Sequence, residues 1–575
     1  MVRTDFIQVI LPLRLEWEPF YKLPEGLQVQ VGDRVRVIFA NAFYVGTVSA
    51  VNVTPNLEAD RILPVEALEK DLPAVTPEEI RFWKEIASYY LCSVGEVYKV
   101  ACPRMAQHKS RLEAPETGAP QTAALSSDEN QALEAVRRGF REGKPVLLAG
   151  KSRTALYLSL ALDAWKEGRS TLIIAPETAL SRLPSSLLAY HSRMSEGKRK
   201  AVVKKLRSGE PYVLLGNRSA LFLPHQKLGL VIVDEEHDPA LKQDSPAPRY
   251  HARESAIMLA RIHGANVLLG SATPSLESLY NAQCGRFIQA DLKESFNKPK
   301  AQVEIINTAA EIRKNGMSGS LSLKLLAHMQ EVLSAGQQVL LLGPRRSYPD
   351  GKKLEAEVLD IFPSARLGSL NEGTAEEQLE TLREFSEGSF DILVGSSLVT
   401  RGFETEKLGL VAIIGADGML SRQDFRADER AVQVLEQQRD RCDLFVIQTR
   451  EPKHPVFTAL KEGEDTTARI LEERRCFGYP PFSRLVKVQV RDKVEKRLQY
   501  LTRELAQELA GITAVTGPYA PAWWPHPTEK VQEMLLLLPR DKELNARKQA
   551  ISACVTAFEQ ARKYSGHIII DVDPV

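Results

Sequence analysis

Apolar and polar residues alternate along the chain in more than one rhythm. Up to about residue 105, short runs such as Arg34–Phe39 alternate apolar and polar positions, and Gly26, Gly32 and Gly46 stand at the expected turns. This pattern is typical of short strands and predicts a small β-rich domain over 1–105. A helical pattern over Trp83–Leu91 closes it.

From residue 125 to about 285, helical patterns alternate with short apolar runs, and a second series of the same kind spans roughly 286–455. The expected strands are Val146–Ala149, Thr171–Ala175, Tyr212–Leu215, Val231–Val233 and Val267–Leu269 in the first series, and Val339–Leu342, Asp391–Val394, Leu410–Ile414 and Leu444–Gln448 in the second. This rhythm predicts two consecutive parallel α/β units. Ligands of such units bind at the carboxyl ends of the strands.

Two further segments complete the predicted organisation. Residues 106–124 are polar, contain proline and have no periodicity, which predicts a linker. Residues 456–575 mix helical patterns with a strand over His567–Val572, which predicts an α+β domain.

Composition narrows the class of protein. The 575 residues allow roughly four domains. The net charge is +1, so a polyanionic partner has to be held by local basic surfaces. No pair among the six cysteines is spaced C-x-x-C, so neither a zinc ribbon nor a disulfide framework is indicated. No apolar stretch reaches the ~18 residues of a membrane span. We expect a cytoplasmic protein with reduced thiols, no structural metal and no membrane partner.

The strongest candidate for chemistry is the run Val-Ile-Val-Asp-Glu-Glu-His at 231–237. Three residues suited to a buried strand end in paired carboxylates, and a Ser-Ala-Thr turn at 271–273 follows a later strand. This arrangement is typical of a nucleic-acid motor. In such a site Asp234 would position Mg²⁺ and Glu235 would polarise the attacking water.

Several longer segments resemble the PriA family of bacterial replication restart helicases. They are Gly-Asn-Arg-Ser-Ala-Leu-Phe-Leu-Pro (216–224), Leu-Gly-Leu-Val-Ile-Val-Asp-Glu-Glu-His-Asp (228–238), Pro-Arg-Tyr-His-Ala-Arg-Glu (248–254), Leu-Gly-Ser-Ala-Thr-Pro-Ser-Leu-Glu-Ser (269–278), Asp-Phe-Arg-Ala-Asp-Glu-Arg (424–430), Tyr-Pro-Pro-Phe (479–482) and Asp-Val-Asp-Pro (571–574). The resemblance covers nearly the whole chain in unbroken order.

This resemblance implies two tandem RecA-like helicase lobes, with an N-terminal β-rich DNA-binding domain and a C-terminal domain that binds DNA or partners. It implies an ATP- and Mg²⁺-dependent 3′–5′ DNA helicase that acts on stalled or forked DNA. The implied protein partners are primosome and replisome-loading proteins, together with single-stranded DNA-binding protein.

The phosphate-binding loop departs from the family pattern. Such a loop needs Gly, four residues and Gly-Lys-Ser/Thr between a strand and a helix. Here the nucleotide-binding candidates are Gly150, Lys151, Ser152, Arg153 and Thr154. If Tyr157 matches the tyrosine that follows the loop in the family, three loop residues are missing. Arg153 then stands in the place of the lysine, and Ser152 in the place of its glycine.

Other parts of the nucleotide machinery differ as well. Glu129 stands where the family has its adenine-reading glutamine, and 395–404 departs from the family's motif in the second lobe. The arginine-bearing stretch is reduced to Glu436–Cys442, in which Arg439 and Arg441 are the candidates for a finger but match no spacing. The eight cysteines of the family's zinc module are absent, so we expect no zinc. Loss of a finger alone lowers turnover by about 10³–10⁵.

The candidate DNA-binding residues follow the acidic motif. Arg249, Tyr250, His251 and Arg253 combine cations with an aromatic ring, a mixture that can hold the DNA backbone and stack on bases. The alternative is a loop that braces the lobe through Tyr250.

Two hypotheses of different class therefore stand. The first is a protein that binds branched DNA or stalled forks and supports replication restart without unwinding, in which Asp234 and Glu235 are vestigial. The second is an active 3′–5′ helicase whose atypical loop still uses ATP and Mg²⁺. The intact carboxylates favour the second hypothesis, and the shortened loop and the missing arginine stretch favour the first. A decayed copy without function is a third possibility.

Overall fold

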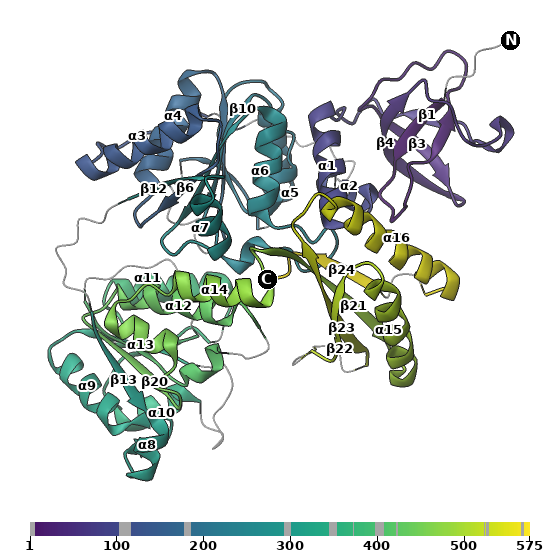
Figure 1. The fold of residues 1–575 in the computed structure, drawn as a ribbon. Helices are drawn as coiled ribbons and strands as arrows, with labels where there is room; N and C mark the ends of the chain where they lie inside the picture. Colours follow the sequence, from purple (N-terminus) through teal and green to yellow (C-terminus); the bar gives the residue numbers. More distant parts are fainter. Residues whose placement is uncertain are drawn as a thin grey trace.

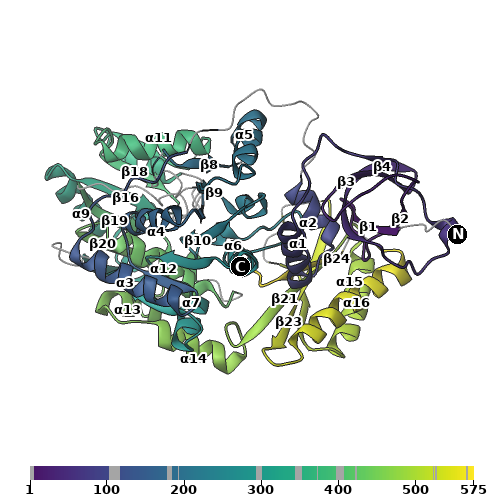
Figure 2. The same ribbon diagram turned by 90° about the horizontal axis from the view of Figure 1, so that it is seen from above.

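The computed structural model describes the chain except for residues 1–5, 103–114, 116, 178–183, 185, 192, 293–300, 344–352, 372, 397–406, 421–423, 522–523, 525–527 and 565–567. Most of the predicted linker and the segment 397–404 lie outside the described residues. Two α/β lobes lie beside each other, and the N-terminal and C-terminal parts lie together next to the first lobe (Figures 1 and 2).

The N-terminal part is an antiparallel sheet followed by two helices. Its strands are β1 (Phe6–Ile10), β2 (Phe20–Lys22), β3 (Arg34–Phe39), β4 (Ala42–Val51) and β5 (Ala67–Leu68), in the order β2-β1-β4-β3-β5, and its helices are α1 (Pro77–Tyr90) and α2 (Val94–Ala101). Both helices begin with a capping box, formed by Thr76 with Glu79 and by Ser93 with Glu96. The β-rich domain expected here is present.

Lobe 1 has a seven-stranded parallel sheet in the order β12-β6-β11-β10-β7-β9-β8. The strands are β6 (Val146–Ala149), β7 (Ser170–Ile174), β8 (Leu188–Tyr190), β9 (Val213–Gly216), β10 (Leu228–Asp234), β11 (Asn266–Ser271) and β12 (Ile288–Asp291). The helices are α3 (Ser127–Arg141), α4 (Thr154–Lys166), α5 (Glu196–Leu206), α6 (Ala252–His263) and α7 (Leu276–Gln283). All seven residues of β10 are buried, because the strand lies inside the sheet.

Lobe 2 has a six-stranded parallel sheet in the order β13-β20-β19-β16-β18-β17. The strands are β13 (Gln302–Asn307), β16 (Gln338–Leu342), β17 (Leu367–Ser369), β18 (Ile392–Gly395), β19 (Leu408–Ile413) and β20 (Leu444–Thr449), with a small hairpin of β14 (Met317–Ser318) and β15 (Leu321–Ser322). The helices are α8 (Thr308–Arg313), α9 (Leu323–Ser334), α10 (Leu354–Ile361), α11 (Ala375–Ser386), α12 (Ala427–Arg439) and α13 (Pro455–Glu462). Val456 and Phe457 of α13 belong to the core of this lobe, so lobe 2 extends past residue 455.

The C-terminal domain is an antiparallel sheet with flanking helices. Its elements are α14 (Thr467–Phe477), β21 (Ser483–Asp492), α15 (Glu495–Ala510), β22 (Ala514–Tyr519), β23 (Lys530–Pro539), α16 (Leu544–Arg562) and β24 (Ile568–Val572), with the strand order β22-β23-β21-β24. The fold class expected from the sequence is confirmed: two RecA-like lobes carry a β-rich N-terminal domain and an α+β C-terminal domain.

The edge strands that sequence reasoning missed share a physical cause. The edge strands β8, β12, β13 and β17 are short or partly exposed, so they lack a long apolar run. The strands β21 and β23 differ from the edge strands. Buried and partly exposed positions alternate along most of their length, so an alternating pattern in the sequence does indicate them.

Each described helix is too short or too polar to pass through a bilayer. Within the described residues, no group of three or more His, Cys, Asp or Glu side chains is arranged to hold a metal ion.

Lobe 1 contains buried neutral histidines, which predict a pH dependence of its stability. His225 is fully enclosed: its Nε2 lies 2.8 Å from the Ala220 carbonyl oxygen and its Nδ1 lies 2.9 Å from the Tyr212 hydroxyl. Burial lowers the pKa of His225 from 6.5 to about 4, and burial does the same for His251. Stability is therefore complete above pH 6.5 and falls as the pH drops from 6.5 toward 4, because only the unfolded chain accepts the proton readily.

Between pH 6.5 and pH 5 each histidine should remove about 2 kcal/mol from the stability of lobe 1. Hydrogen exchange of the β9 and β10 amides, measured at increasing urea concentration, reports this loss of stability. His225→Gln keeps a donor and an acceptor at this position but cannot take up a proton. The pH-dependent loss of stability should therefore be smaller in this variant by the amount that one histidine contributes. An unchanged profile in that variant would show that His225 is not the group responsible.

Candidate functional site

The paired acids lie at the carboxyl end of β10, where a RecA-like lobe has its nucleotide site. Asp234 is aligned with Gly270 of the neighbouring strand β11, and Glu235 adopts a left-handed backbone with φ of 50° as the chain leaves the sheet. The residues Asp234 and Glu235 are only 6 % and 9 % exposed. Because carboxylates are rarely buried without a cation, the identity of the charge beside them decides what they do.

That charge is the guanidinium of Arg153. Its Nη2 lies 2.6 Å from Asp234 Oδ1 and 3.1 Å from Glu235 Oε1, and its Nε lies 3.0 Å from Asp234 Oδ1. The Tyr157 hydroxyl donates a third hydrogen bond to the same Asp234 oxygen at 2.7 Å. Although burial opposes the charged form, Tyr157, Asp234 and Glu235 together raise the pKa of Arg153 well above its ordinary value. The guanidinium therefore supplies the positive charge that accompanies these two buried carboxylates.

The loop that carries Arg153 is short and closed on itself. Only Gly150 to Arg153 separate β6 from α4. Arg153 Nη1 donates to the Gly150 carbonyl oxygen, and Gly150 takes a φ of 134°. A Cβ atom at Gly150 would lie 2.5 Å from the Leu292 carbonyl oxygen, so this position requires glycine. The loop thus places the Arg153 guanidinium beside the two acids at the carboxyl end of β10.

Lys151, the second cation of the loop, forms an ion pair with lobe 2. Lys151 Nζ lies 2.9 Å from Asp440 Oδ2, and the same aspartate pairs with Arg439 through an Nε–Oδ1 contact of 2.9 Å. Lys151 therefore serves a bridge between the lobes, and the side chain of the finger candidate Arg439 is engaged there. Thr154 begins α4, whose N-terminus has no side-chain cap. The nucleotide-binding candidates do lie together, but the contacts that they make are internal.

Helix α12 of lobe 2 is hydrogen-bonded to the Ser-Ala-Thr turn of lobe 1. Gln437 Nε2 donates to Thr273 Oγ1 at 2.9 Å, and Gln433 Nε2 donates to the Thr273 carbonyl oxygen at 3.3 Å. The Leu276 backbone N–H donates to Glu429 Oε1 at 2.8 Å. These bonds join the two lobes directly through protein groups.

In the predicted DNA-binding segment, Tyr250 and His251 are buried, and Arg249 and Arg253 are half-buried. That this segment holds DNA stays a prediction. Tyr250 is 0 % exposed and packs edge-on against Phe222, with ring centroids 4.9 Å apart, so its ring cannot stack on a base. His251 Nδ1 accepts a hydrogen bond from the Arg253 backbone N–H and caps α6. Arg249 is partly buried, and burial lowers its pKa. The alternative reading, a loop that braces the lobe through Tyr250, fits these contacts.

Arg253 belongs to the same internal network. Its Nη1 lies 2.8 Å from Glu236 Oε2 and 2.6 Å from Ser275 Oγ, and its Nη2 lies 2.8 Å from Glu254 Oε1. Glu236 is 0 % exposed and also accepts the Ser275 backbone N–H at 2.6 Å. Arg253 is thus a structural cation that ties α6 to the start of α7.

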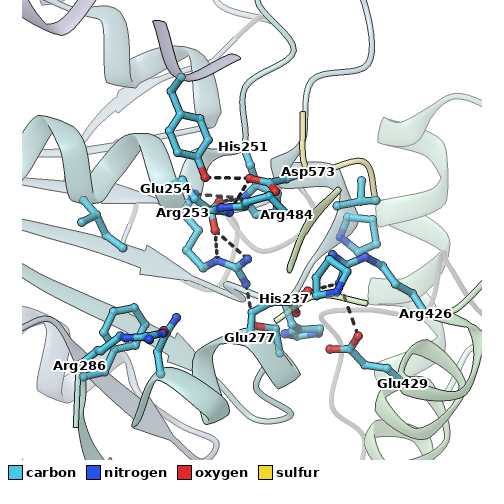
Figure 3. A pocket seen from close by; sticks show the side chains of 18 of the residues that line it. His237, His251, Arg253, Glu254, Glu277, Arg286, Arg426, Glu429, Arg484 and Asp573 are labelled. Carbon is cyan, nitrogen blue, oxygen red and sulfur yellow. Dashed lines mark hydrogen bonds and ion pairs between the residues drawn. The ribbon is translucent and has the colours of Figure 1, made fainter. Parts of the chain in front are cut away.

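Sequence reasoning missed a pocket where all four parts of the chain meet. Figure 3 shows it between lobe 1, lobe 2, α1 and the C-terminal domain; its volume is about 460 Å³. Near its centre Arg484 Nη1 lies 2.7 Å from Asp573 Oδ2, and the Tyr89 hydroxyl donates to the same oxygen at 2.8 Å. These residues are far apart in the sequence, so spacing gave no signal for the pocket.

Comparison with known proteins adds family relationships to this geometry. Residues 8–103 match the family model of the PriA 3′DNA-binding domain (3′BD), and residues 475–575 match that of the primosomal protein N C-terminal domain. The chain is 25 % identical to replication restart protein PriA of Rickettsia conorii, over 87 % of this chain and 89 % of that protein. It is 27 % identical to replication restart protein PriA of Bacillus subtilis, over 69 % of this chain and 60 % of that protein.

Solved structures give a weaker likeness. RecG bound to a three-way DNA junction aligns with a TM-score of 0.39 and 13 % identity, over 83 % of this chain and 70 % of that chain. The DUF1998 helicase MrfA bound to DNA aligns with a TM-score of 0.39 and 14 % identity, over 69 % of this chain and 59 % of that chain. Scores of this size do not establish a shared fold by themselves.

Proposed function

Since the chain belongs to the PriA family of replication restart proteins, we propose that it binds forked or branched DNA and supports replication restart without ATP-driven unwinding. The observation that carries this proposal is the ion pair of Arg153 with Asp234 and Glu235, with Nη2–oxygen distances of 2.6 and 3.1 Å. A motor needs these carboxylates to hold Mg²⁺ and to orient water. Here both carboxylates instead pair with the Arg153 guanidinium.

Mg-ATP does not fit the residues present. To admit it, Arg153 would have to leave a buried position at which it is 6 % exposed, and Lys151 would have to leave Asp440. Both acids would then face a loop in which Ser152 stands in the place of the family's glycine and Arg153 in the place of its lysine. Each of these changes opposes nucleotide binding, so we derive no catalytic step through ATP or Mg²⁺.

The cross-lobe bonds support the same proposal. In a motor, nucleotide commonly bridges the two lobes and its turnover moves them. In this protein Lys151–Asp440 and Gln437–Thr273 join the lobes through protein groups alone. The lobes then act as a platform of fixed geometry, with DNA and primosome or replisome-loading proteins, and single-stranded DNA-binding protein, as the proposed partners.

Fork binding and DNA-stimulated ATP hydrolysis, measured on one preparation, test this proposal. We expect tighter binding to a forked DNA than to a plain duplex of equal length, with no change on addition of Mg-ATP. We expect no DNA-stimulated hydrolysis above background.

Asp234→Asn is the matched variant for the rival hypothesis of an active helicase. Turnover in the wild type that disappears in Asp234→Asn would establish the helicase and end the binding-only proposal. Equal affinity for fork and duplex, together with no hydrolysis, would remove both functions.

A further inference from the structure

The pocket at the meeting point of the four parts is lined by many arginines, and its carboxylates are already used. Glu254 pairs with Arg253 at 2.8 Å, and Asp573 pairs with Arg484 at 2.7 Å. The other two acids of the lining are paired in the same way: Glu277 with Arg426 at 2.5 Å, and Glu429 with Arg474 at 2.6 Å. Most of these groups are drawn in Figure 3.

Four lining arginines lie outside these pairs, and two of them are paired elsewhere, Arg261 with Glu85 and Arg430 with Asp424. The other two are in excess. Arg286 donates to Asn281 Oδ1 at 3.1 Å and Arg540 donates to the Ser483 carbonyl oxygen at 3.4 Å, which are contacts with neutral groups. Among the residues that the structure describes, no carboxylate forms an ion pair with either arginine. Both residues retain exposed surface, although the Arg540 guanidinium is partly enclosed by the pocket.

The positive charges of Arg286 and Arg540 also repel each other. Burial lowers the pKa of Arg540, and the nearby Arg484 and Arg286 lower it further. Asp573 opposes this effect but is itself held by Arg484. An anion placed between Arg286 and Arg540 would relieve this repulsion, because it would supply the charge that the protein lacks there.

We propose that this pocket binds a phosphate group carried by a nucleotide, held by Arg286 and Arg540. Guanidinium groups match phosphate oxygens in geometry and bind them through charge-assisted hydrogen bonds. A volume of about 460 Å³ is sufficient for one nucleotide. The inference rests on the proposed function, in which the phosphate belongs to the backbone of the bound fork. A free nucleotide would offer the same chemistry.

The position of the pocket gives the contact a consequence. Arg286 follows α7 of lobe 1, whereas Arg540 follows β23 of the C-terminal domain. A strand held by both would connect lobe 1 to the C-terminal domain at the point where Tyr89 of α1 also contacts Asp573. DNA bound there would fix the arrangement of three parts of the chain at once.

The decisive variant is the double substitution Arg286→Ala/Arg540→Ala. Binding of a fluorescein-labelled fork is measured by anisotropy between 50 and 300 mM salt (values on the order of those at which phosphate contacts dominate). Loss of the one phosphate that both arginines hold should reduce the slope of log K against log salt by about 0.9. Affinity at about 100 mM salt should fall roughly tenfold or more.

The matched control is Arg366→Ala/Arg383→Ala, which removes the same charge from the exposed surface of lobe 2. These arginines pair with Asp391 and with Glu380, outside the pocket. The control should keep the wild-type slope, and both double variants should unfold at the wild-type temperature.

A second arm identifies the source of the phosphate. If the fork slope is unchanged but calorimetry shows pyrophosphate binding to the wild type and not to the pocket variant, the pocket takes a free phosphorylated ligand. If neither phosphate probe separates the pocket variant from the control, the proposal is wrong. An effect on a glutamate-rich peptide alone would also overturn it, because the pocket would then bind protein.

The same data separate this inference from the function on which it rests. A wild type that does not prefer fork over duplex contradicts the proposed function. A wild type that prefers the fork, with a pocket variant that behaves as the control does in both arms, contradicts only the pocket.

Discussion

Arg153→Ala should lower the stability of lobe 1 by about 3–5 kcal/mol. The substitution removes the cation that Asp234 and Glu235 share and leaves two buried carboxylates side by side. Uncompensated charges in a buried site are strongly unfavourable, and here they also repel each other. Because the chain has several parts, hydrogen exchange in β6, β10 and β11 under urea is the appropriate measurement, since it reports lobe 1 alone.

Arg137→Ala is the control for this experiment. Arg137 also lies in lobe 1 and also pairs with two acids, Asp163 and Glu134, but its side chain is 35 % exposed. Its loss should change stability by roughly 0–1 kcal/mol. A similarly small effect for Arg153→Ala would show that the acids do not depend on the guanidinium.

Removing Asp234 together with Arg153 tests the same point with one buried charge left, that of Glu235, in place of two. Arg153→Met with Asp234→Leu replaces the main ion pair by apolar side chains of similar size. Such replacements of buried pairs are often neutral or stabilising. The double variant should therefore recover much of the stability lost in Arg153→Ala, whereas a purely additive loss would argue against a direct pair.

Asp573→Ala should be the second most damaging substitution, with a loss of about 3 kcal/mol or more. Asp573 accepts hydrogen bonds from Arg484 at 2.7 Å and from the Tyr89 hydroxyl at 2.8 Å, so it joins the C-terminal domain to α1. Its removal leaves the Arg484 charge in a largely buried site. Faster hydrogen exchange in α1 and β24 should accompany the loss, because both elements meet at this residue.

A pH titration isolates the charge of Asp573. Burial opposes ionisation, but Arg484 and the Tyr89 hydroxyl dominate and hold the pKa of Asp573 at about 2, below its ordinary value of 3.8. The stabilisation is therefore complete above about pH 4 and is lost as the pH falls through about 2. The difference between the wild type and Asp573→Asn should be constant above pH 4 and should narrow below it.

A surface aspartate of the same domain serves as the control. Asp541 pairs with Arg547 at 2.7 Å, but its side chain is 46 % exposed. Asp541→Ala should leave hydrogen exchange in α1 and β24 unchanged. Equal effects for Asp541→Ala and Asp573→Ala would contradict the special role of the buried pair.

Much of the fold followed from local patterns. The buried parallel strands β6, β10, β11 and β16 were recognisable as apolar runs because strands buried on both faces carry little else. The edge strands were not recognisable, since β8 and β17 have only three residues each and β12 and β13 include polar ones. The packing of Tyr250 was not recognisable for a related reason: a tyrosine between two cations resembles a binding surface in the sequence, and no local pattern reports its contact with Phe222.

The sequence by itself determined that Asp234 ends a buried strand and that the loop after β6 departs from the phosphate-loop pattern. Only the tertiary structure decided which group contacts the acids. β6 and β10 lie on either side of β11, so the segments that follow them meet at one edge of the sheet. Arg153 is 81 residues from Asp234 in the chain, and no local periodicity reports such a contact. Strand patterns depend on burial along the chain, whereas ion pairs and the arginine pocket depend on which distant segments folding brings together.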